Sequence, residues 1–356
     1  MNDFLSELQN SFQSQMLPDH DELLALTDEA ITVLESEDAA YRPRSEGADG
    51  QVAGGLLDFT AQPVLPLIVV PDLHARCDFF MHLLTTPLVR LGLGDGLDSA
   101  TGDAKDATVL SALFQKKIRV VCVGDLFHSE TRGKARWLTA WDAYARGDYE
   151  NADMTSEMQE NLTLFQLVLR VKNAFPAAFH FLKGNHENIL NEGGRGNYPF
   201  RKFADEGNMV YDFMASHYGD AVLHVMSLWE HALPLCAAFP ACVVSHAEPR
   251  AAYTRQEIID AEKNPAVVLG LTWTANDEAA AGSVRKTLQE LLGGARAQNA
   301  VWLSGHRPVR DRYALRQNGA LVQIHNPAVE QVAVVHPARA FHAETDIILL
   351  VSEAGS

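Results

Sequence analysis

Five short apolar runs, each followed at once by a cluster of His, Asp or Asn residues, limit what this chain can fold into more than any other feature. These runs are strand candidates at residues 67–70, 118–123, 178–182, 241–244 and 301–303. Helix-like patterns lie between them, among others at residues 77–84, 134–145 and 158–172. After His306 come further strand candidates, at residues 312–316, 321–325, 332–336 and 347–351. Alternating buried strands and helices predict an α/β fold with its chemistry at the carboxyl ends of the strands.

The polar clusters contain the residue types that bind divalent cations. In chain order they are Asp72 with His74, Asp125 with His128, Asn185 with His186 and Glu187, His246 with Glu248, and His306 with Arg307. Carboxylate, imidazole and amide oxygen together suit cations such as Mn, Fe or Zn. A single Asp between two such ions can bridge them at about 3.5–4 Å. One cluster of this kind can arise by chance, but five in order behind strands predict a hydrolase with two metal ions.

With these motifs the sequence resembles the calcineurin-like metallophosphoesterase superfamily, whose pattern is DxH, GDxx, GNH[ED], H and GH. It is most similar to the phosphoprotein phosphatase branch, which includes bacterial Ser/Thr phosphatases and diadenosine-tetraphosphatase relatives. Residues 72–78 (DLHARCD) are similar to the DLHGxxD of that branch, and residues 184–187 are its GNHE. The resemblance covers residues 66–335. It implies a sandwich of two mixed sheets flanked by helices, with a catalytic domain at residues 61–356 and a helical extension and linker at residues 1–60.

The resemblance also implies roles for single residues. The six expected metal ligands are Asp72, His74, Asp125, Asn185, His246 and His306. Asp72 and His74 would hold the first ion, Asp125 would bridge, and the other three would complete the site of the second ion. The two ions are expected to be Mn, with Fe, Zn or Mg also suited. A hydroxide that bridges the metals would attack phosphorus in a single step, while His186 protonates the leaving oxygen.

The second motif departs from the branch. Its usual form is GDxxDRG, whereas here residues 124–130 read GDLFHSE, so that His128 stands where an Asp is expected. That Asp normally orients the catalytic histidine. One hypothesis is that the imidazole of His128 lies near His186, or points at the substrate, and takes part in proton transfer. The alternative is that His128 faces solvent and that Glu130 or Glu187 orients His186. Ala75, where the branch has Gly, is a milder change.

The arginine of that motif, which normally grips the substrate phosphate, is also missing. Candidate replacements are Arg250, Arg307 and Arg201, with Arg195 as a further one. The expected substrate is a phosphomonoester, including phosphoserine or phosphothreonine in a protein. The alternatives are a nucleotide pyrophosphohydrolase, or a phosphodiesterase or nuclease, because GDLFH also occurs in the nuclease branch. A non-catalytic metal-binding scaffold would be marked by lost ligands, and every expected ligand is present.

Charge and cysteine usage narrow the class of protein further. The 46 acidic and 29 basic residues give a net charge of −17. This balance argues against nucleic acid as a partner, because binding its backbone needs clustered Lys and Arg. The start of the chain is unlike a signal peptide, no apolar run is long enough to cross a bilayer, and the four cysteines lack metal-site spacing. These observations predict a reduced, cytoplasmic protein.

Three stretches do not follow the alternation of strands and helices. Residues 1–40 predict one or two amphipathic helices, with Pro18 and Asp19 as the point of separation. They are expected to pack on the main domain, and a docking element for a partner is the alternative. The Gly-rich stretch at residues 45–55 is interpreted as a loop or linker, and residues 91–105 as a surface loop.

Overall fold

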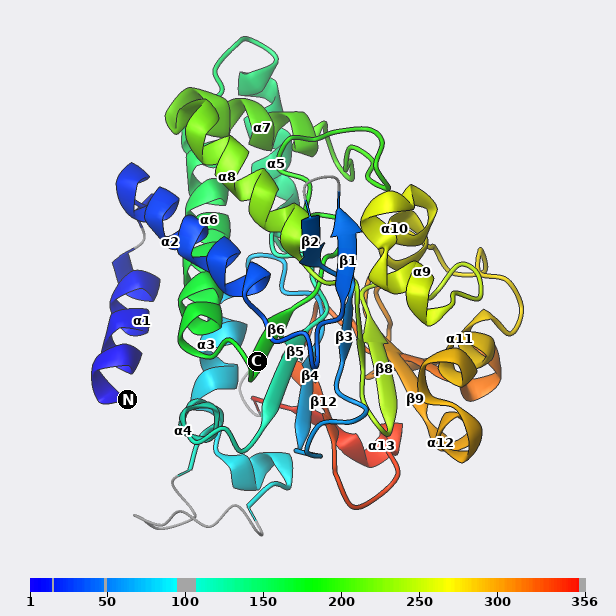
Figure 1. Ribbon diagram of the computed structural model, residues 1–356. Helices are drawn as coiled ribbons and strands as arrows, with labels where there is room; N and C mark the ends of the chain where they lie inside the picture. The colour runs from blue at the N-terminus through cyan, green and yellow to red at the C-terminus, as the bar shows by residue number, and fades with distance from the viewer. Residues whose placement is uncertain (15, 48–49, 95–106, 352–356) are drawn as a thin grey trace.

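The computed structural model describes residues 1–14, 16–47, 50–94 and 107–351. Two facing β-sheets form its centre, with helices on the outer side of each (Figure 1). One sheet consists, in spatial order, of β13 (Ile347–Leu349), β12 (Gln331–Val335), β4 (Leu67–Val70), β5 (Arg119–Cys122) and β6 (Phe179–Phe181). The other consists of β10 (Ala314–Arg316), β11 (Leu321–Gln323), β9 (Val301–Ser304), β8 (Cys242–Ser245), β7 (Cys236–Ala238) and β3 (Leu56–Asp58).

Both sheets are mixed. In the first, β4, β5 and β6 run parallel, while β12 is antiparallel to β4, with Val69 opposite Ala333. In the second, β8, β9 and β11 run parallel, while β7 is antiparallel to β8. The expected α/β sandwich of two mixed sheets flanked by helices is confirmed. The parallel strands of each sheet end at the same edge, which brings the polar segments that follow them together.

Alternating side chains explain why these apolar runs form the interior. Val69, Val121 and Leu303 belong to the core layer between the two sheets. Their neighbours Ile68 and Val120 belong instead to the core under the helices of the first sheet, because successive side chains of a strand point to opposite faces. A strand covered on both faces needs a continuous apolar run, and all residues of β4 and β5 are buried.

Helices cover each sheet as separate layers. Those packed in the core under the first sheet are α1 (Asn2–Ser14), α2 (His20–Glu35), α3 (Cys77–Thr85), α4 (Val109–Phe114), α5 (Lys134–Tyr144), α6 (Ala152–Ala174), α7 (Glu206–His217) and α8 (Gly219–Ala232). Those on the second sheet are α9 (Arg255–Ile259), α10 (Pro265–Thr272), α11 (Ser283–Leu292) and α12 (Gly294–Asn299). The short helix α13 (Ala343–Asp346) joins β12 to β13. No helix in the described part of the chain is long and apolar enough to span a bilayer.

The N-terminal segment begins with two helices, where one or two were expected. They separate at Pro18 and Asp19, and the Asp19 side chain caps α2 by accepting from the backbone N–H groups of Asp21 and Glu22. Leu8 and Leu23 are fully buried in the core of the first sheet. The division of the chain at residue 60 remains a prediction.

The loop prediction for residues 45–55 is wrong. β1 (Arg44–Gly47) and β2 (Gly50–Ala53) pair as an antiparallel hairpin, and β3, just beyond, joins the edge of the second sheet beside β7. This hairpin is held by hydrogen bonds between backbone groups. A polar, Gly-rich sequence has no alternating apolar pattern from which such strands could be predicted. Of the loop expected at residues 91–105, residues 95–105 lie outside the described residues.

Candidate metal centre

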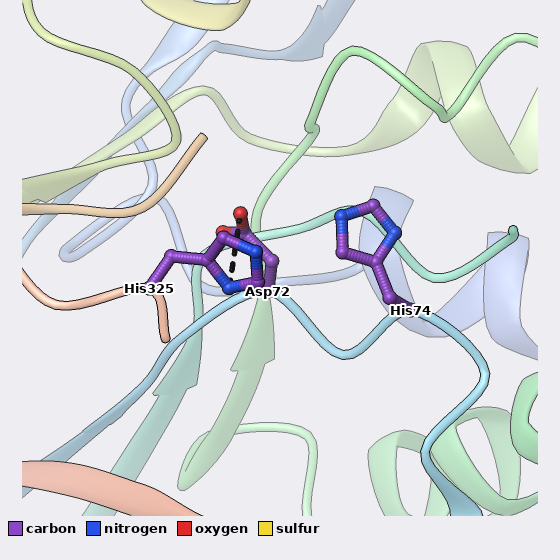
Figure 2. A group of neighbouring side chains, drawn as sticks. All are labelled: Asp72, His74 and His325. Atoms are coloured by element: carbon purple, nitrogen blue, oxygen red, sulfur yellow. Dashed lines mark ion pairs between the residues drawn. The ribbon is translucent and has the colours of Figure 1, made fainter. Parts of the chain in front are cut away.

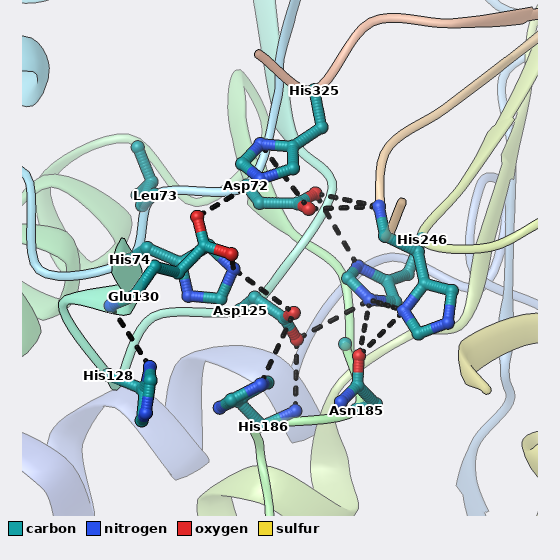
Figure 3. A network of polar contacts seen from close by, with 12 residues as sticks. Asp72, Leu73, His74, Asp125, His128, Glu130, Asn185, His186, His246 and His325 are labelled. Atoms are coloured by element: carbon teal, nitrogen blue, oxygen red, sulfur yellow. Dashed lines mark hydrogen bonds and ion pairs between the residues drawn. The ribbon is translucent and has the colours of Figure 1, made fainter. Parts of the chain in front are cut away.

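The segments that follow six strands, β4, β5, β6, β8, β9 and β11, meet at one edge of the two sheets and form a buried cluster (Figure 3). Three groups of side chains in it have ligand atoms within 4.8 Å of one another: Asp72 with His74 and His325, His74 with Asp125 and His186, and Asp125 with His246 and His306. Asn185 joins the last group, because its Oδ1 lies 2.9 Å from His246 Nε2 and 2.8 Å from His306 Nδ1. All six residues predicted as metal ligands are thus brought together.

Asp125 occupies the middle of the cluster. Its Oδ2 lies 3.6 Å from His74 Nε2, and its Oδ1 lies 3.4 Å from His246 Nε2. Oδ1 also accepts a hydrogen bond of 2.9 Å from the backbone N–H of His186. The two oxygens of one buried carboxylate therefore face two different groups of candidate ligands. A carboxylate placed in this way can serve two cations.

Backbone conformation is unusual throughout the cluster. His74, Asp125 and His306 have positive φ values of 45°, 54° and 65°. Such values are uncommon for residues other than glycine, and strained backbone of this kind tends to collect at functional sites. Ala75, where the resembling branch has Gly, has a φ of 56°. An L side chain is disfavoured in this conformation, which explains why Gly suits the position better.

Backbone carbonyls determine which ring nitrogen of two histidines faces the cluster. His74 Nδ1 donates to the carbonyl of Phe127 at 3.2 Å, and His246 Nδ1 donates to the carbonyl of Val123 at 3.1 Å. Because a carbonyl only accepts, both Nδ1 atoms carry the proton, and the Nε2 lone pairs point at the carboxylates. Metal-binding histidines are usually oriented in this way.

Because the cluster is buried, its carboxyl groups resist ionisation and its imidazoles resist protonation when no cation is bound. It raises the pKa of Asp72 to about 6, against the opposing effect of His325, and it raises the pKa of Asp125 well above the ordinary value, with Asp72 adding to the effect. It also lowers the pKa of His74 and of His306 to about 3. Carboxylates that resist ionisation beside neutral imidazoles would be stabilised in their charged form by divalent cations. The donor set therefore fits such ions.

Glu187, the last residue of GNHE, holds the two central loops together. Its carboxylate accepts hydrogen bonds from the backbone N–H groups of Gly184, Asp125 and Leu126, at 2.6, 3.0 and 2.8 Å. The loops approach so closely that a Cβ at Gly184 would collide with the Asp125 carboxylate. The alternative in which Glu187 orients His186 is therefore wrong, because both of its oxygens are bound to backbone.

His128 is fully buried, so the alternative in which it faces solvent is wrong. Its Nδ1 accepts from the backbone N–H of Glu130 at 3.0 Å, and its Nε2 lies 3.5 Å from Glu206 Oε1. Its ring stacks on Trp137 with centroids 4.9 Å apart. It does lie near His186, at 5.4 Å between centroids. Both of its ring nitrogens nevertheless face groups other than that histidine.

His186 lies at the rim of the cluster. Its side chain is 12 % exposed, and its Nε2 lies 4.0 Å from Asp125 Oδ2. Phe200 covers the ring at a centroid distance of 4.5 Å, and Nδ1 has no hydrogen-bond partner among the described residues. Burial and the nearby His74 and His128 lower the pKa of His186 well below its ordinary value.

The predicted phosphate-binding arginines all lie on the surface. Arg250 and Arg307 are exposed, and Arg307 is close enough to contribute to the low pKa of His306. Arg201 is 66 % exposed and pairs with Asp205 at 3.0 Å. The sequence interpretation missed Lys202, whose Nζ lies 2.7 Å from Glu130 Oε1.

Two further residues of the cluster had been given no metal-site role. His325 follows β11, and its Nδ1 lies 3.5 Å from Asp72 Oδ2 (Figure 2). Glu130 lies between His74 and His325, with Oε1 3.6 Å from His74 Nε2 and Oε2 3.2 Å from His325 Nε2. The signal for His325 was its place at the end of the strand candidate at residues 321–325. It was not used because no recognised motif surrounds it.

Comparisons with known proteins support the fold. No family model and no curated protein matches the sequence. Among solved structures, a protein serine/threonine phosphatase from Saccharomyces cerevisiae, similar to the human phosphatase PP5, aligns with a TM-score of 0.54 and 13% identity, over 98% of this chain and 95% of that one. A cold-active protein-tyrosine phosphatase of a psychrophilic Shewanella species aligns with a TM-score of 0.40 and 13% identity, over 83% and 82%, too low to carry an argument. The chain thus has a fold like that of the yeast phosphatase.

Proposed function

We propose that this protein is a metal-dependent phosphoesterase that hydrolyses phosphomonoesters, phosphoserine and phosphothreonine included. The observation that carries the proposal is the position of Asp125, whose two oxygens face His74 on one side and His246 on the other. The fold that the chain shares with a serine/threonine phosphatase supports the same class of reaction.

Two divalent cations, most suitably Mn, would be held in this cluster. Asp72 and His74 would bind the first, Asn185, His246 and His306 the second, and Asp125 both. Such a pair polarises phosphoryl oxygens and lowers the pKa of bound water. The protein supplies a dry setting for this chemistry, since Asp72, His246 and Asp125 are at most 2 % exposed.

His186 would donate the proton that the leaving oxygen needs. It is the histidine of the central loops that keeps an exposed edge beside the buried carboxylates, and its Nδ1 is not used by a protein partner among the described residues. Phe200 on its ring restricts its orientation. These features suit a side chain that, in its protonated form, can deliver a proton to a bound ester at the rim. Arg307, Arg250 and Arg201 remain the proposed phosphate contacts, with Lys202 added at the same rim.

The test combines an activity panel with metal analysis. The panel contains a phosphomonoester, a phosphopeptide, a phosphodiester and a dinucleoside tetraphosphate, each with Mn, Mg, Zn or no metal. Preferred, metal-dependent hydrolysis of the first two is expected. Asp125→Asn should lose most of both ions by elemental analysis, whereas His82→Ala, at a half-exposed site on α3, should retain them. Wild-type metal content in Asp125→Asn, or activity on the diester alone, would contradict the proposal.

A further inference from the structure

We infer that His325 binds the first cation through Nδ1 and that Glu130 positions its imidazole. This inference rests on the proposed function, because it assigns further residues to the same metal centre. Figure 2 shows the ring of His325 beside the carboxylate of Asp72, with His74 on the far side.

The first argument is the state of the two ring nitrogens of His325. Its Nε2 lies 3.2 Å from Oε2 of Glu130 and makes a hydrogen bond there. An ionised carboxylate only accepts, so Nε2 is the donor, and in the neutral ring Nδ1 carries the lone pair. That Nδ1 is buried, has no hydrogen-bond partner among the described residues, and lies 3.5 Å from Asp72 Oδ2.

A lone pair that faces a carboxylate oxygen in a buried site is unfavourable unless something positive lies between them. A divalent cation bound by both atoms at about 2.1 Å would place them roughly 3.0–3.4 Å apart in octahedral or tetrahedral geometry. The observed separation of 3.5 Å is close to this range. Water or a monovalent ion would relieve the same contact less strongly.

The second argument is that His325 is held in the same way as two other buried histidines of the cluster, His74 and His246. His74 and His246 each donate one ring N–H to a protein acceptor and turn the other nitrogen towards the carboxylates. In His325 the acceptor is the carboxylate of Glu130 instead of a carbonyl. A carboxylate in this position raises the basicity of the ligand and keeps the ring in one orientation.

Glu130 is suited to position the ring and not to bind the metal itself. Its Oε2 is used by His325, and its Oε1 accepts a hydrogen bond of 2.7 Å from Lys202. With His325 included, the first cation has four protein ligands: Asp72, His74, Asp125 and His325. The second cation also has four, so that both cations have the same number of protein ligands and share Asp125.

Metal-binding measurements on the full chain test the inference without depending on activity. Chelator-treated wild type, His325→Ala, His306→Ala, the double variant and Glu130→Gln are titrated with Mn²⁺ by calorimetry. Co²⁺ absorption spectra then report the ligands around each ion. His82→Ala is the matched control, since this half-exposed histidine pairs with Glu330 outside the cluster.

The wild type should bind two ions, and His325→Ala and His306→Ala one each, with different Co²⁺ spectra. The double variant should bind neither ion well. Glu130→Gln should keep both ions but weaken one of them about 10–100-fold, as for other residues that orient a metal ligand.

Two ions bound to His325→Ala with wild-type affinity and spectrum would overturn this inference alone, whereas a wild type that binds none would overturn the proposed function as well. If His325→Ala loses the circular dichroism spectrum of the folded protein, the Mn²⁺ titration of Glu130→Gln tests the inference instead. One weakened ion then supports the inference, and two unchanged ions overturn it.

Discussion

The backbone N–H of His306 donates to the carboxylate of Asp72, at 2.9 Å from Oδ2 and 3.2 Å from Oδ1. The two residues follow β9 and β4, which belong to different sheets. This contact ties the edges of both sheets together where the candidate ligands collect. It depends on the residue before His306, because a Cβ at Gly305 would overlap Asp72 Oδ1 and press on Val123.

Gly305→Ala should therefore disturb the metal centre without altering a ligand. The added methyl group must displace Asp72, and we expect weaker binding of one ion, measured by Mn²⁺ titration. Gly193→Ala is the control, since a Cβ there would come within 4 Å of Pro199 alone among the described residues, at 3.9 Å. Unchanged metal affinity in Gly305→Ala would show that Asp72 is not a ligand or that the loop yields easily.

His186→Asn should keep both metal ions but lower kcat by roughly 10²–10⁴-fold on a substrate with a poor leaving group. The loss should shrink for nitrophenyl phosphate, whose leaving group needs no proton. Because burial, His74 and His128 lower the pKa of His186, its protonated fraction falls already below neutral pH. We expect kcat for poor leaving groups to decline as the pH rises through that lowered value. Equal losses on both kinds of substrate would exclude the role of proton donor.

His128→Ala should reduce stability more than it changes proton transfer. The variant removes a buried ring stacked on Trp137 and should lower the free energy of unfolding by about 2–5 kcal/mol. Since both ring nitrogens face Glu130 and Glu206, the pH dependence of kcat should keep its shape in His128→Ala and in His128→Asp. A pH profile that moves in either variant would show that His128 takes part in proton transfer.

The ionised Glu206 side chain should increase the free energy of unfolding, and this contribution should be lost in acid. Burial alone would raise its pKa, but the nearby His128 and hydrogen bonds from the backbone of Lys202 and Phe203 bring the pKa down to about 2. A carboxyl whose pKa is lower in the folded state stabilises the protein above its unfolded pKa, near 4.5, and this contribution disappears as the pH falls towards 2. Urea unfolding of metal-free wild type and Glu206→Gln should differ by about 3 kcal/mol at pH 6 and progressively less below pH 4.5. A difference that is independent of pH would contradict the lowered pKa.

Glu37→Gln should be strongly destabilising. Glu37 is buried, with contacts of 2.6 Å to Arg42 Nη1, 2.5 Å to Lys172 Nζ and 3.2 Å to His180 Nδ1. Without its charge two buried cations repel each other, and we expect a loss of about 3–5 kcal/mol in the free energy of unfolding. Asp277→Asn, which breaks an exposed pair with Arg316, should change stability by about 1 kcal/mol or less. Equal effects in the two variants would mean that the Glu37 network is not held by its charges.

Local sequence was enough for the strands of the central sheets other than β3 and β7, and the motifs predicted the gathering of six candidate ligands. Buried strands such as β4 and β5 need continuous apolar runs, and the side chains that follow parallel strands meet at one edge. The break between α1 and α2 was also readable, because Pro18 and Asp19 act through local backbone geometry and capping. The apolar strand runs and this helix break depend on residues that are near one another in the chain.

Only the tertiary structure decided which groups surround each ligand. His325 comes beside Asp72 because β11 lies next to β9 in the sheet facing β4, and no spacing in the sequence encodes this order. His128 is buried between Trp137 on α5 and Glu206 on α7, and α7 comes from a distant part of the chain. The β1–β2 hairpin forms through backbone pairing in a stretch without hydrophobic pattern. Strand order and helix packing bring together residues that are far apart in the chain, and local patterns report only what each segment buries.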